Sequence, residues 1–237
     1  EERRLYEGVS AYLSRPNWAF GAEGGGKYMI LLIYRKLLAS SSFALRSALH
    51  KLVVRLEEMA AGRGPDTVDV EDFEDDVTAS VEAVEESTAD EHVVPEGVTH
   101  SIETELQEVR EYARLCDSIA ENAKAQRVVE AMPELLNAGD KVLIFTQYIA
   151  TQEHLAGELR EAGYDVVEFN GQLKKHANPD KDEQEQVKRR FRNHADVMIA
   201  TDAGAEGLNL QFCHIVVNYD LPWNPMRVEQ RIGRVDR

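Results

Sequence analysis

Four arginines stand close together at the carboxyl end of the sequence. Arg227, Arg231 and Arg234 follow one another at spacings of four and three residues, and Arg237 lies three residues further on. On a helix these spacings place the side chains largely on one side, together with the neighbouring Gln230. A guanidinium group offers a fixed fork of hydrogen-bond donors, which suits phosphate groups. The pattern therefore predicts a helix that binds a phosphate or polyphosphate.

Small polar residues and glycines lie at the carboxyl ends of three predicted strands further upstream, at residues 141–146, 165–169 and 197–201. Ligands of parallel sheets lie outside the carboxyl ends of the strands. Small side chains there let backbone N–H groups approach a phosphodiester chain without reading its bases. Ordinary turns and helix caps at the strand ends are the alternative. The predicted nucleic-acid contacts are Thr146, Gln147, Asn170, Gly171, Thr201 and Gly204.

The predicted strands alternate with helical patterns. Residues 215–218 predict a fourth strand, and helices are predicted at 102–115, 119–136, 151–162 and 180–193. Alternation with short connections produces right-handed crossovers and a parallel sheet with helices on both faces. The predicted fold class is therefore α/β, with a parallel sheet that is preceded by an α-helical segment.

The sequence of the N-terminal part, residues 1–63, predicts helices and no strands. Apolar stripes recur at helical spacing within residues 5–13, 30–38 and 45–59, and serines at 40–42 offer an N-cap for the third helix. The predicted domain organisation is an α-helical segment at 1–63, an acidic linker or insertion at 64–100 and the α/β lobe at 101–237.

The net charge of −16 is concentrated in one segment. Residues 64–109 contain sixteen acidic residues and no Lys or Arg, so the rest of the chain has 27 acidic and 27 basic residues. A polar, Pro-bounded segment with few aromatic residues is typical of a solvated linker. A nucleic-acid mimic that shields a basic groove, a tail that binds a protein partner, and a halophilic source are the alternatives. If the segment shields a groove, deletion of residues 65–96 should strengthen a nucleic-acid affinity that falls steeply with salt.

The composition indicates a globular protein. An apolar content of 43% is enough to form a core, and the apolar run at residues 29–34 is far shorter than the about 20 residues of a membrane span. No signal peptide is recognisable. The two cysteines are isolated, and no His or Cys cluster has metal-ligand spacing. We therefore expect no metal site, no membrane contact and a cytoplasmic location, in a prokaryotic cytosol.

Four stretches resemble those of a known family. ATDAGAEGLNLQ (residues 200–211) is similar to motif V, and QRIGRVDR (230–237) to motif VI, of superfamily 2 nucleic-acid-dependent ATPases. DLPWNP between them and VLIFTQY (142–148) upstream resemble Swi/Snf-type double-stranded DNA translocases and their RapA-like relatives. The N-terminal helices are similar to the segment that links the two motor lobes in RapA-like proteins. The resemblance implies a RecA-like second motor lobe, truncated within motif VI.

The resemblance also implies roles for individual residues. Arg234 and Arg237 match positions that cross the cleft between the lobes and touch the γ-phosphate of ATP. Gln230 matches a position that helps to sense the nucleotide, and Gly207 and Asn209 match motif V positions that approach the nucleotide and couple it to DNA. The implied ligands are double-stranded DNA and ATP with Mg²⁺, held mainly by an N-terminal lobe of the same parent chain. The implied function is the C-terminal lobe of an ATP-dependent DNA translocase or helicase.

One loop has the spacing of a nucleotide-binding motif. GAEGGGK, at residues 21–27, satisfies GxxxxGK, the pattern of a P-loop. Tyr28 stands where a Ser or Thr would hold Mg²⁺, and no buried strand is predicted before the loop, so we expect a flexible connector. A DExH or DExD sequence placed after a strand is also lacking. We therefore expect these residues alone to hydrolyse ATP only at a background rate.

Alternatives of a different kind stay open. A degenerate lobe with an acidic tail would serve as a non-catalytic interaction module, and an RNA-directed helicase is a nearer alternative that DLPWNP disfavours. A GxGKT loop and a DExH or DExD box upstream of Glu1 in the parent reading frame would favour the ATP-dependent translocase or helicase over the interaction module. Trp223 is expected to pack beneath the following helix, and stacking on a base is the alternative.

Overall fold

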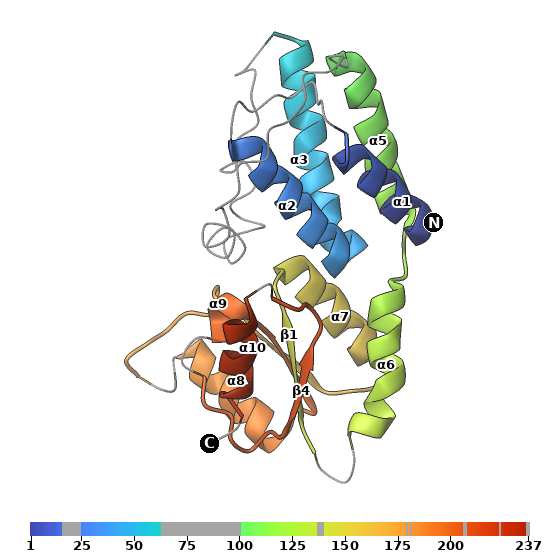
Figure 1. Ribbon diagram of the computed structural model, residues 1–237. Coiled ribbons are helices and arrows are strands. Elements are labelled where there is room, and N and C mark those ends of the chain that lie inside the picture. The colour runs from blue at the N-terminus through green and yellow to red at the C-terminus, as the bar shows by residue number, and fades with distance from the viewer. Residues whose placement is uncertain are drawn as a thin grey trace. The chain divides into compact units, whose positions relative to one another are not determined.

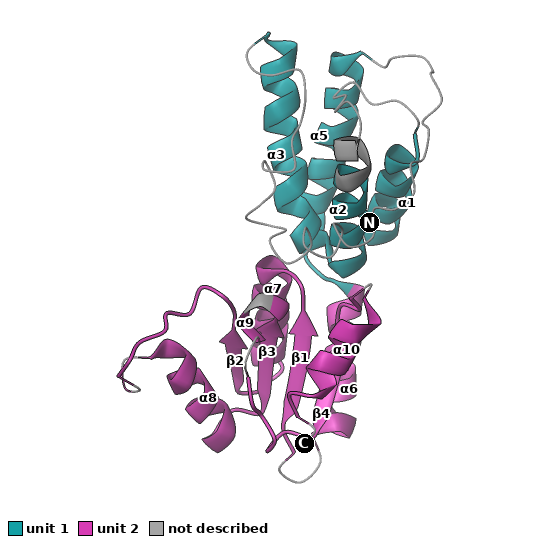
Figure 2. Ribbon diagram, turned by 60° about the vertical axis from the view of Figure 1, so that its left-hand side comes forward, with its two compact units in different colours: residues 1–122 teal, residues 123–237 magenta. Residues whose placement is uncertain are grey.

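The computed structural model describes most of the chain, in two compact units. Residues 1–15, 25–62, 101–136, 140–178, 180, 182–205, 208–222 and 224–235 are described. The first unit comprises Glu1–Asn122 and the second Ala123–Arg237 (Figure 2). The acidic linker or insertion predicted at residues 64–100 lies outside the described residues.

The first unit is built from α-helices in its described part. These are α1 (Glu2–Leu13), α2 (Gly25–Ser40), α3 (Ser42–Ala60) and α5 (Ile102–Ser118). α3 packs along α5, and α1 packs against both α2 and α5. Each of these helices buries an apolar stripe, as predicted from the helical periodicity.

α5 belongs with the helical unit rather than with the sheet. Its apolar face, with Leu106, Val109 and Ala113 buried, packs on α3. The guanidinium group of Arg15, just after α1, also forks onto the carboxylate of Glu108 in α5. The boundary between the units therefore lies between residues 122 and 123, whereas the sequence pattern suggested residue 101.

The second unit contains a four-stranded parallel sheet. Every neighbouring pair of strands is parallel, so the carboxyl ends of all four meet at one edge, the carboxyl edge. The order across the sheet is β2-β3-β1-β4. The strands are β1 (Val142–Thr146), β2 (Val166–Phe169), β3 (Val197–Thr201) and β4 (Ile215–Asn218).

Helices cover both faces of this sheet, as predicted. α6 (Ala123–Leu135) and α7 (Ile149–Glu161) lie on one face, and α8 (Glu183–Asn193) and α10 (Pro225–Ile232) lie on the other (Figure 1). A one-turn helix, α9 (Asp202–Ala205), follows β3 directly. The arrangement is a RecA-like fold.

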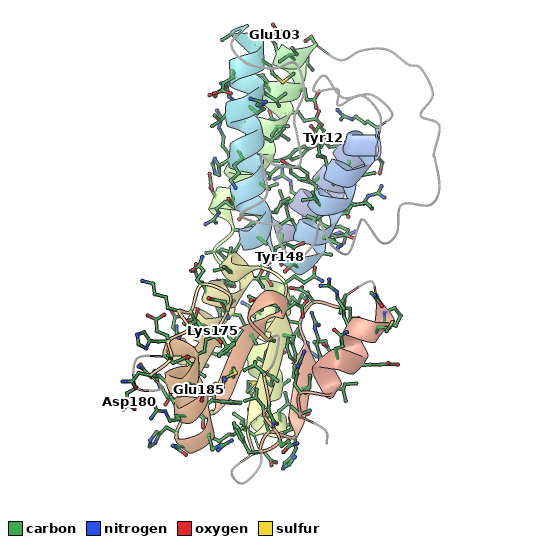
Figure 3. All side chains as sticks on the ribbon, turned by 90° about the vertical axis from the view of Figure 1, so that its left-hand side faces the viewer. Tyr12, Glu103, Tyr148, Lys175, Asp180 and Glu185 are labelled. Carbon is green, nitrogen blue, oxygen red and sulfur yellow. The ribbon has the colours of Figure 1, made fainter. Side chains whose placement is uncertain are left out.

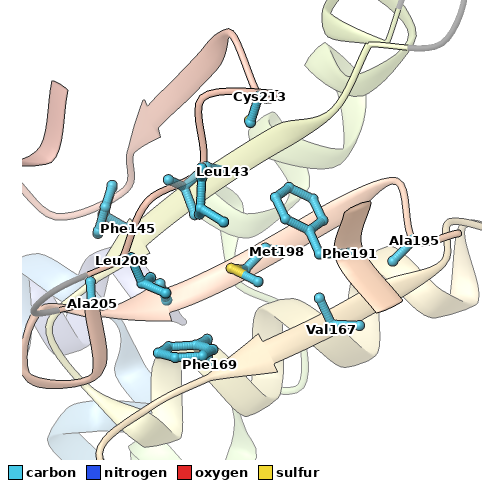
Figure 4. Close-up of a cluster of buried hydrophobic side chains, with 12 residues drawn as sticks. Leu143, Phe145, Val167, Phe169, Phe191, Ala195, Met198, Ala205, Leu208 and Cys213 are labelled. Carbon is cyan, nitrogen blue, oxygen red and sulfur yellow. The ribbon is translucent and has the colours of Figure 1, made fainter. Parts of the chain in front are cut away.

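Alternate side chains of the strands enter two separate cores, because successive residues of a strand point to opposite faces. Leu143 and Phe145 of β1 meet Phe191 of α8 in one core (Figure 4). Ile144 meets Leu155 of α7 in the other core. All residues of β1 and β3 are buried, which explains their continuous apolar runs in the sequence.

The arginine-bearing helix is shorter than predicted. α10 ends at Ile232, and Gly233 takes the C-cap position. The carbonyl oxygen of Arg234 accepts a hydrogen bond from the backbone N–H of Leu210 (2.9 Å), so the chain here pairs with the segment that follows α9. Arg234 thus lies in the turn after the helix, and the prediction of one helix that carries all four arginines is wrong.

Both cysteines are buried. Cys116 belongs to α5, and Cys213 lies shortly before β4. Burial raises the pKa of Cys116 to about 12 and also raises the pKa of Cys213. Within the described residues, no three His, Cys, Asp or Glu side chains gather as metal ligands. None of the helices in the described part of the chain is long and apolar enough to cross a bilayer.

Candidate functional site

The end of β1 is held by a carboxylate. The hydroxyl of Thr146 donates to Oδ2 of Asp220 (2.7 Å), and the backbone N–H of Gln147 donates to the same oxygen (3.0 Å). Thr146 is completely buried, so its side chain faces the protein, whereas Gln147 is partly exposed. Of this predicted pair, Gln147 therefore offers the accessible polar group at the carboxyl edge.

Asp220 is a junction of several elements. Its Oδ1 accepts from Nζ of Lys124 in α6 (2.9 Å), and its backbone carbonyl oxygen accepts from Arg231 in α10 (2.7 Å). Lys124 Nζ also lies 4.1 Å from the centroid of the Tyr219 ring, a cation–π contact. A carboxylate this deeply buried is stable only with such partners. Sequence reasoning missed Asp220, although it lies two residues after β4, where the strand-end rule would have found it.

Arg231 fixes α10 to the ends of β3 and β4. Its Nε and Nη2 fork onto the carboxylate of Asp202 (2.7 Å each), which directly follows β3. Its Nη1 donates to Oδ1 of Asn218 and to the carbonyl oxygen of Asp220 (2.7 Å each). Arg231 is only 3% exposed, and its guanidinium carbon lies 5.0 Å from the centroid of the Phe145 ring. The sequence pattern grouped Arg231 with the phosphate-binding arginines, and the structure corrects this, because its donors are used within the protein.

A second junction joins the end of β2 to β3. Gln152, buried in α7, donates through Nε2 to the carbonyl oxygens of Phe169 (3.2 Å) and Ile199 (2.7 Å). Its Oε1 accepts from Nδ2 of Asn170 (2.8 Å), which orients this partly exposed side chain at the end of β2. Gln152 was not predicted as a site residue. One signal in the sequence could have identified it. Gln152 is a polar residue three positions before Leu155, on the face of α7 where an apolar residue is expected.

A glycine lets β2 and β3 approach each other beyond their ends. A Cβ atom at Gly204 would lie 2.5 Å from Cα of Asn170, which is closer than a side chain tolerates. The N–H of Gly204 donates a long hydrogen bond to the hydroxyl of the buried Thr201 (3.4 Å), and Gly171 is exposed after Asn170. The structure therefore gathers the predicted residues of these two strand ends. Their role in nucleic-acid binding stays a prediction.

An exposed loop continues from Gly171 to α8, and Lys175 stands on it (Figure 3). Asp182 holds this loop to the helix. Its Oδ1 accepts from the backbone N–H of Glu185 (3.0 Å), as the N-cap of α8, and its Oδ2 accepts from that of His176 (3.1 Å). The hydrogen bonds from Glu185 and His176 stabilise the charged form and lower the pKa of Asp182.

A separate group of polar side chains is accessible beside α10. Asn209 and Gln230 are exposed, and Arg234 is partly exposed. The hydrogen bond from Leu210 to Arg234 brings the residue after Asn209 against the turn that carries Arg234. Within the described residues, the guanidinium group of Arg234 makes no hydrogen bond or ion pair, in contrast to that of Arg231. None of its donors is therefore engaged by the part of the chain that the structure describes.

Several residues of interest lie outside the described part of the chain. They include Gly207, Trp223 and Arg237, so the predicted roles of these residues stay predictions. The GAEGGGK loop is described only from Gly25, where α2 begins.

The comparisons with known proteins agree with this fold. Residues 123–237 match the family model of the helicase conserved C-terminal domain. The uncharacterized ATP-dependent helicase YqhH of Bacillus subtilis is 46% identical over 121 residues, which cover 51% of this chain and 20% of YqhH. The RNA polymerase-associated protein RapA of Vibrio vulnificus is 29% identical over 153 residues, which cover 64% of this chain and 14% of RapA.

An RNA helicase is also among the relatives. The ATP-dependent RNA helicase DBP2 of Candida glabrata is 30% identical over 137 residues, which cover 56% of this chain and 24% of DBP2. The chain thus spans between 14% and 24% of the length of these three relatives. The matched residues coincide with the second unit, which carries the sheet and both junctions at its carboxyl edge. Residues 123–237 therefore form a helicase conserved C-terminal domain, and the chain is similar to ATP-dependent helicases of superfamily 2.

Proposed function

We propose that these residues form the C-terminal lobe of an ATP-driven translocase or helicase that acts on double-stranded DNA. The observation that carries the proposal is the contrast between two arginines that are three residues apart in the sequence. Arg231 is satisfied within the protein, whereas the guanidinium group of Arg234 makes no hydrogen bond or ion pair among the described residues. An arginine presented in this way suits a negatively charged group from outside the domain.

The proposed chemistry is stabilisation of charge during phosphoryl transfer. Negative charge spreads over the transferred group, and a guanidinium delivered from a second lobe stabilises it when the cleft between the lobes is closed. Arg234 and Arg237 are proposed to supply this charge, while Asn209, Gln230 and Gly207 contact the nucleotide. An N-terminal lobe of the same parent chain is proposed to hold ATP and Mg²⁺. Hydrolysis thereby depends on closure of the lobes.

Nucleic acid is proposed to bind at the carboxyl edge. Gln147, Asn170 and Gly171 supply accessible groups that contact phosphates without reading bases, and the buried Gly204 lets its backbone lie close to that of Asn170. The two threonines at the ends of β1 and β3 hold their neighbours from buried positions. Double-stranded DNA is proposed because of DLPWNP and the similarity to RapA. The similarity to the RNA helicase DBP2 makes RNA the second candidate.

The arginine proposal is tested in the full-length protein. Arg234→Ala and Arg237→Ala should each lower the nucleic-acid-stimulated kcat by about 10³-fold or more, with a much smaller change in the KM for ATP. Arg160→Ala is the matched control, because this exposed arginine pairs with Glu168 on the protein surface. A near-normal kcat in both arginine variants would remove these residues from the mechanism.

The substrate proposal is tested by comparing nucleic acids. Double-stranded DNA should stimulate ATP hydrolysis by the full-length protein more than single-stranded RNA does, and the reverse order would establish the RNA candidate. The 237-residue chain by itself should hydrolyse ATP only at a background rate, with or without DNA. DNA-stimulated turnover by this chain would contradict the proposal that another lobe holds the nucleotide.

A further inference from the structure

Arg231 contacts both halves of the proposed site. Its backbone lies between Gln230 and the turn that carries Arg234, and the N–H of Arg234 donates to its carbonyl oxygen (3.1 Å). Its side chain reaches the other way, to Asp202 after β3 and to Asp220 after β4. Arg231, which is not proposed to touch ATP or nucleic acid, therefore lies between residues that are proposed to touch them.

We propose that Arg231 is a positioning residue that couples nucleic-acid contact at the carboxyl edge to the placement of Arg234. The inference rests on the proposed function and adds to it a physical connection between the two ligands. Coupling of this kind requires a contiguous network of packed and hydrogen-bonded groups.

The first half of the connection runs from β1 to α10. Gln147 is the accessible residue at the end of β1, and its N–H donates to Oδ2 of Asp220. The carbonyl oxygen of Asp220 accepts from Nη1 of Arg231. A phosphate that displaces the backbone at Gln147 therefore acts on Asp220 and, through it, on the guanidinium group of Arg231.

The second half of the connection depends on the fork between Arg231 and Asp202. Two parallel hydrogen bonds between a guanidinium and a carboxylate fix both distance and angle, which a single ammonium contact does not. Arg231 is buried and Asp202 is partly buried, so a partly broken arrangement is costly and the group moves as a whole. Because Arg231 is the last residue but one of α10, its displacement moves the turn that carries Arg234.

The test uses Arg231→Lys in the full-length protein, which keeps the charge and removes the fork. The ratio of nucleic-acid-stimulated to unstimulated kcat should fall about tenfold. The KM for ATP and the nucleic-acid affinity should stay close to those of the wild type. Arg15→Lys is the matched control, because Arg15 forks onto Glu108 in the helical unit and its loss should leave the ratio unchanged.

A second variant keeps Arg231 and its fork intact. Lys124→Met removes the ion pair from Oδ1 of Asp220 and so loosens the residue that joins Gln147 to Arg231. The same ratio should fall by about threefold, a smaller coupling loss than that of Arg231→Lys. This variant decides the matter if Arg231→Lys does not fold, and a wild-type ratio in Lys124→Met then refutes the proposal.

The outcomes separate the coupling role from the proposed function. A wild-type ratio in Arg231→Lys, an equal loss of stimulated and unstimulated rates, or the same loss of ratio in Arg15→Lys each overturns the coupling role. The proposed function still stands in these cases if Arg234→Ala abolishes hydrolysis. An unaltered kcat in Arg234→Ala overturns the proposed function instead.

Discussion

Two hydrogen-bond junctions hold the carboxyl edge of the sheet, and they differ in charge. The ionic junction centres on Arg231 and joins α10 to Asp202, Asn218 and Asp220, at the ends of β3 and β4. The amide junction centres on Gln152 and joins α7 to β2, β3 and Asn170. Both hubs are buried polar side chains on helices, and both serve groups proposed to meet a ligand.

The difference shows how stringently each junction fixes its surroundings. A buried guanidinium loses more solvation than an amide, so it persists only when its donors are almost fully paired. The four bonds of Arg231 are all 2.7 Å long, whereas those of Gln152 range from 2.7 to 3.2 Å. The ionic junction therefore sets the position of a whole helix end, while the amide junction orients one side chain.

The largest effect is expected when the ionic junction loses its cation. Arg231→Met leaves the partly buried carboxylate of Asp202 without its fork and should lower the free energy of unfolding of the second unit by about 3–5 kcal/mol. Urea denaturation, monitored through hydrogen exchange of the β1 amides, measures the free energy of unfolding of this unit alone. The double variant Arg231→Met with Asp202→Leu should recover much of the loss. A single-variant loss of less than about 1 kcal/mol would remove the distinction between the junctions.

A smaller effect is expected at the amide junction. Gln152→Leu leaves the carbonyl oxygens of Phe169 and Ile199 without this donor and should cost about 1–3 kcal/mol in the same measurement. It should also weaken nucleic-acid binding, because Asn170 loses its partner. Gln172→Leu, at an exposed position, is the control. A loss as large as that of Arg231→Met would mean that charge does not distinguish the junctions.

The glycine beside the amide junction gives a sharper comparison. Gly204→Ala places a Cβ atom against the backbone of Asn170 and should cost about 1–2 kcal/mol, with a further loss of nucleic-acid affinity. Gly157→Ala in α7 is the matched control, because its Cβ atom meets nothing within 4 Å and the helix gains about 0.5–1 kcal/mol. Equal stability of the two variants would show that the edge has room to shift.

The smallest effect concerns the exposed carboxylate that caps α8. Because the pKa of Asp182 is lowered in the folded state, its contribution to stability is present above the unfolded value of about 3.9 and is lost as the pH falls through the folded value. The difference in urea midpoint between wild type and Asp182→Asn should thus be largest at neutral pH and shrink in acid. A difference that does not vary with pH would show that the charge of Asp182 contributes nothing to stability and that its effect comes from the cap geometry alone.

The sequence predicted the sheet and its helices because the signals for both are local. Fully buried strands such as β1 are continuous apolar runs, and the helices have clear stripes. The strand-end rule also located Asn170 and Gly204, which the structure brings into contact range. The sequence pattern predicted too long a helix at α10. The helix ends before Arg234, whose carbonyl oxygen pairs with the N–H of Leu210, a residue distant in the sequence.

The roles of individual polar side chains could not be predicted from the sequence, because they depend on partners that are distant in the chain. Arg231 and Arg234 look equivalent in a helical pattern, and only the positions of Asp202 and Asp220 in space separate the buried arginine from the available one. Gln152 is a polar residue on the apolar face of α7, and only the positions of Phe169 in β2 and Ile199 in β3 explain why it is there. Polar residues on apolar faces are thus the positions at which local patterns carry too little information.

The burial of both cysteines has a practical consequence for measurements of motion. Thiol reagents react with the thiolate, and the raised pKa values of Cys116 and Cys213 leave almost none of it at neutral pH. Cysteines introduced at exposed positions, such as Val54→Cys in α3 and Glu153→Cys in α7, should therefore take up maleimide dyes selectively. Energy transfer between a dye on each unit would then follow the distance between the two dyes, in a 237-residue chain that keeps both of its cysteines.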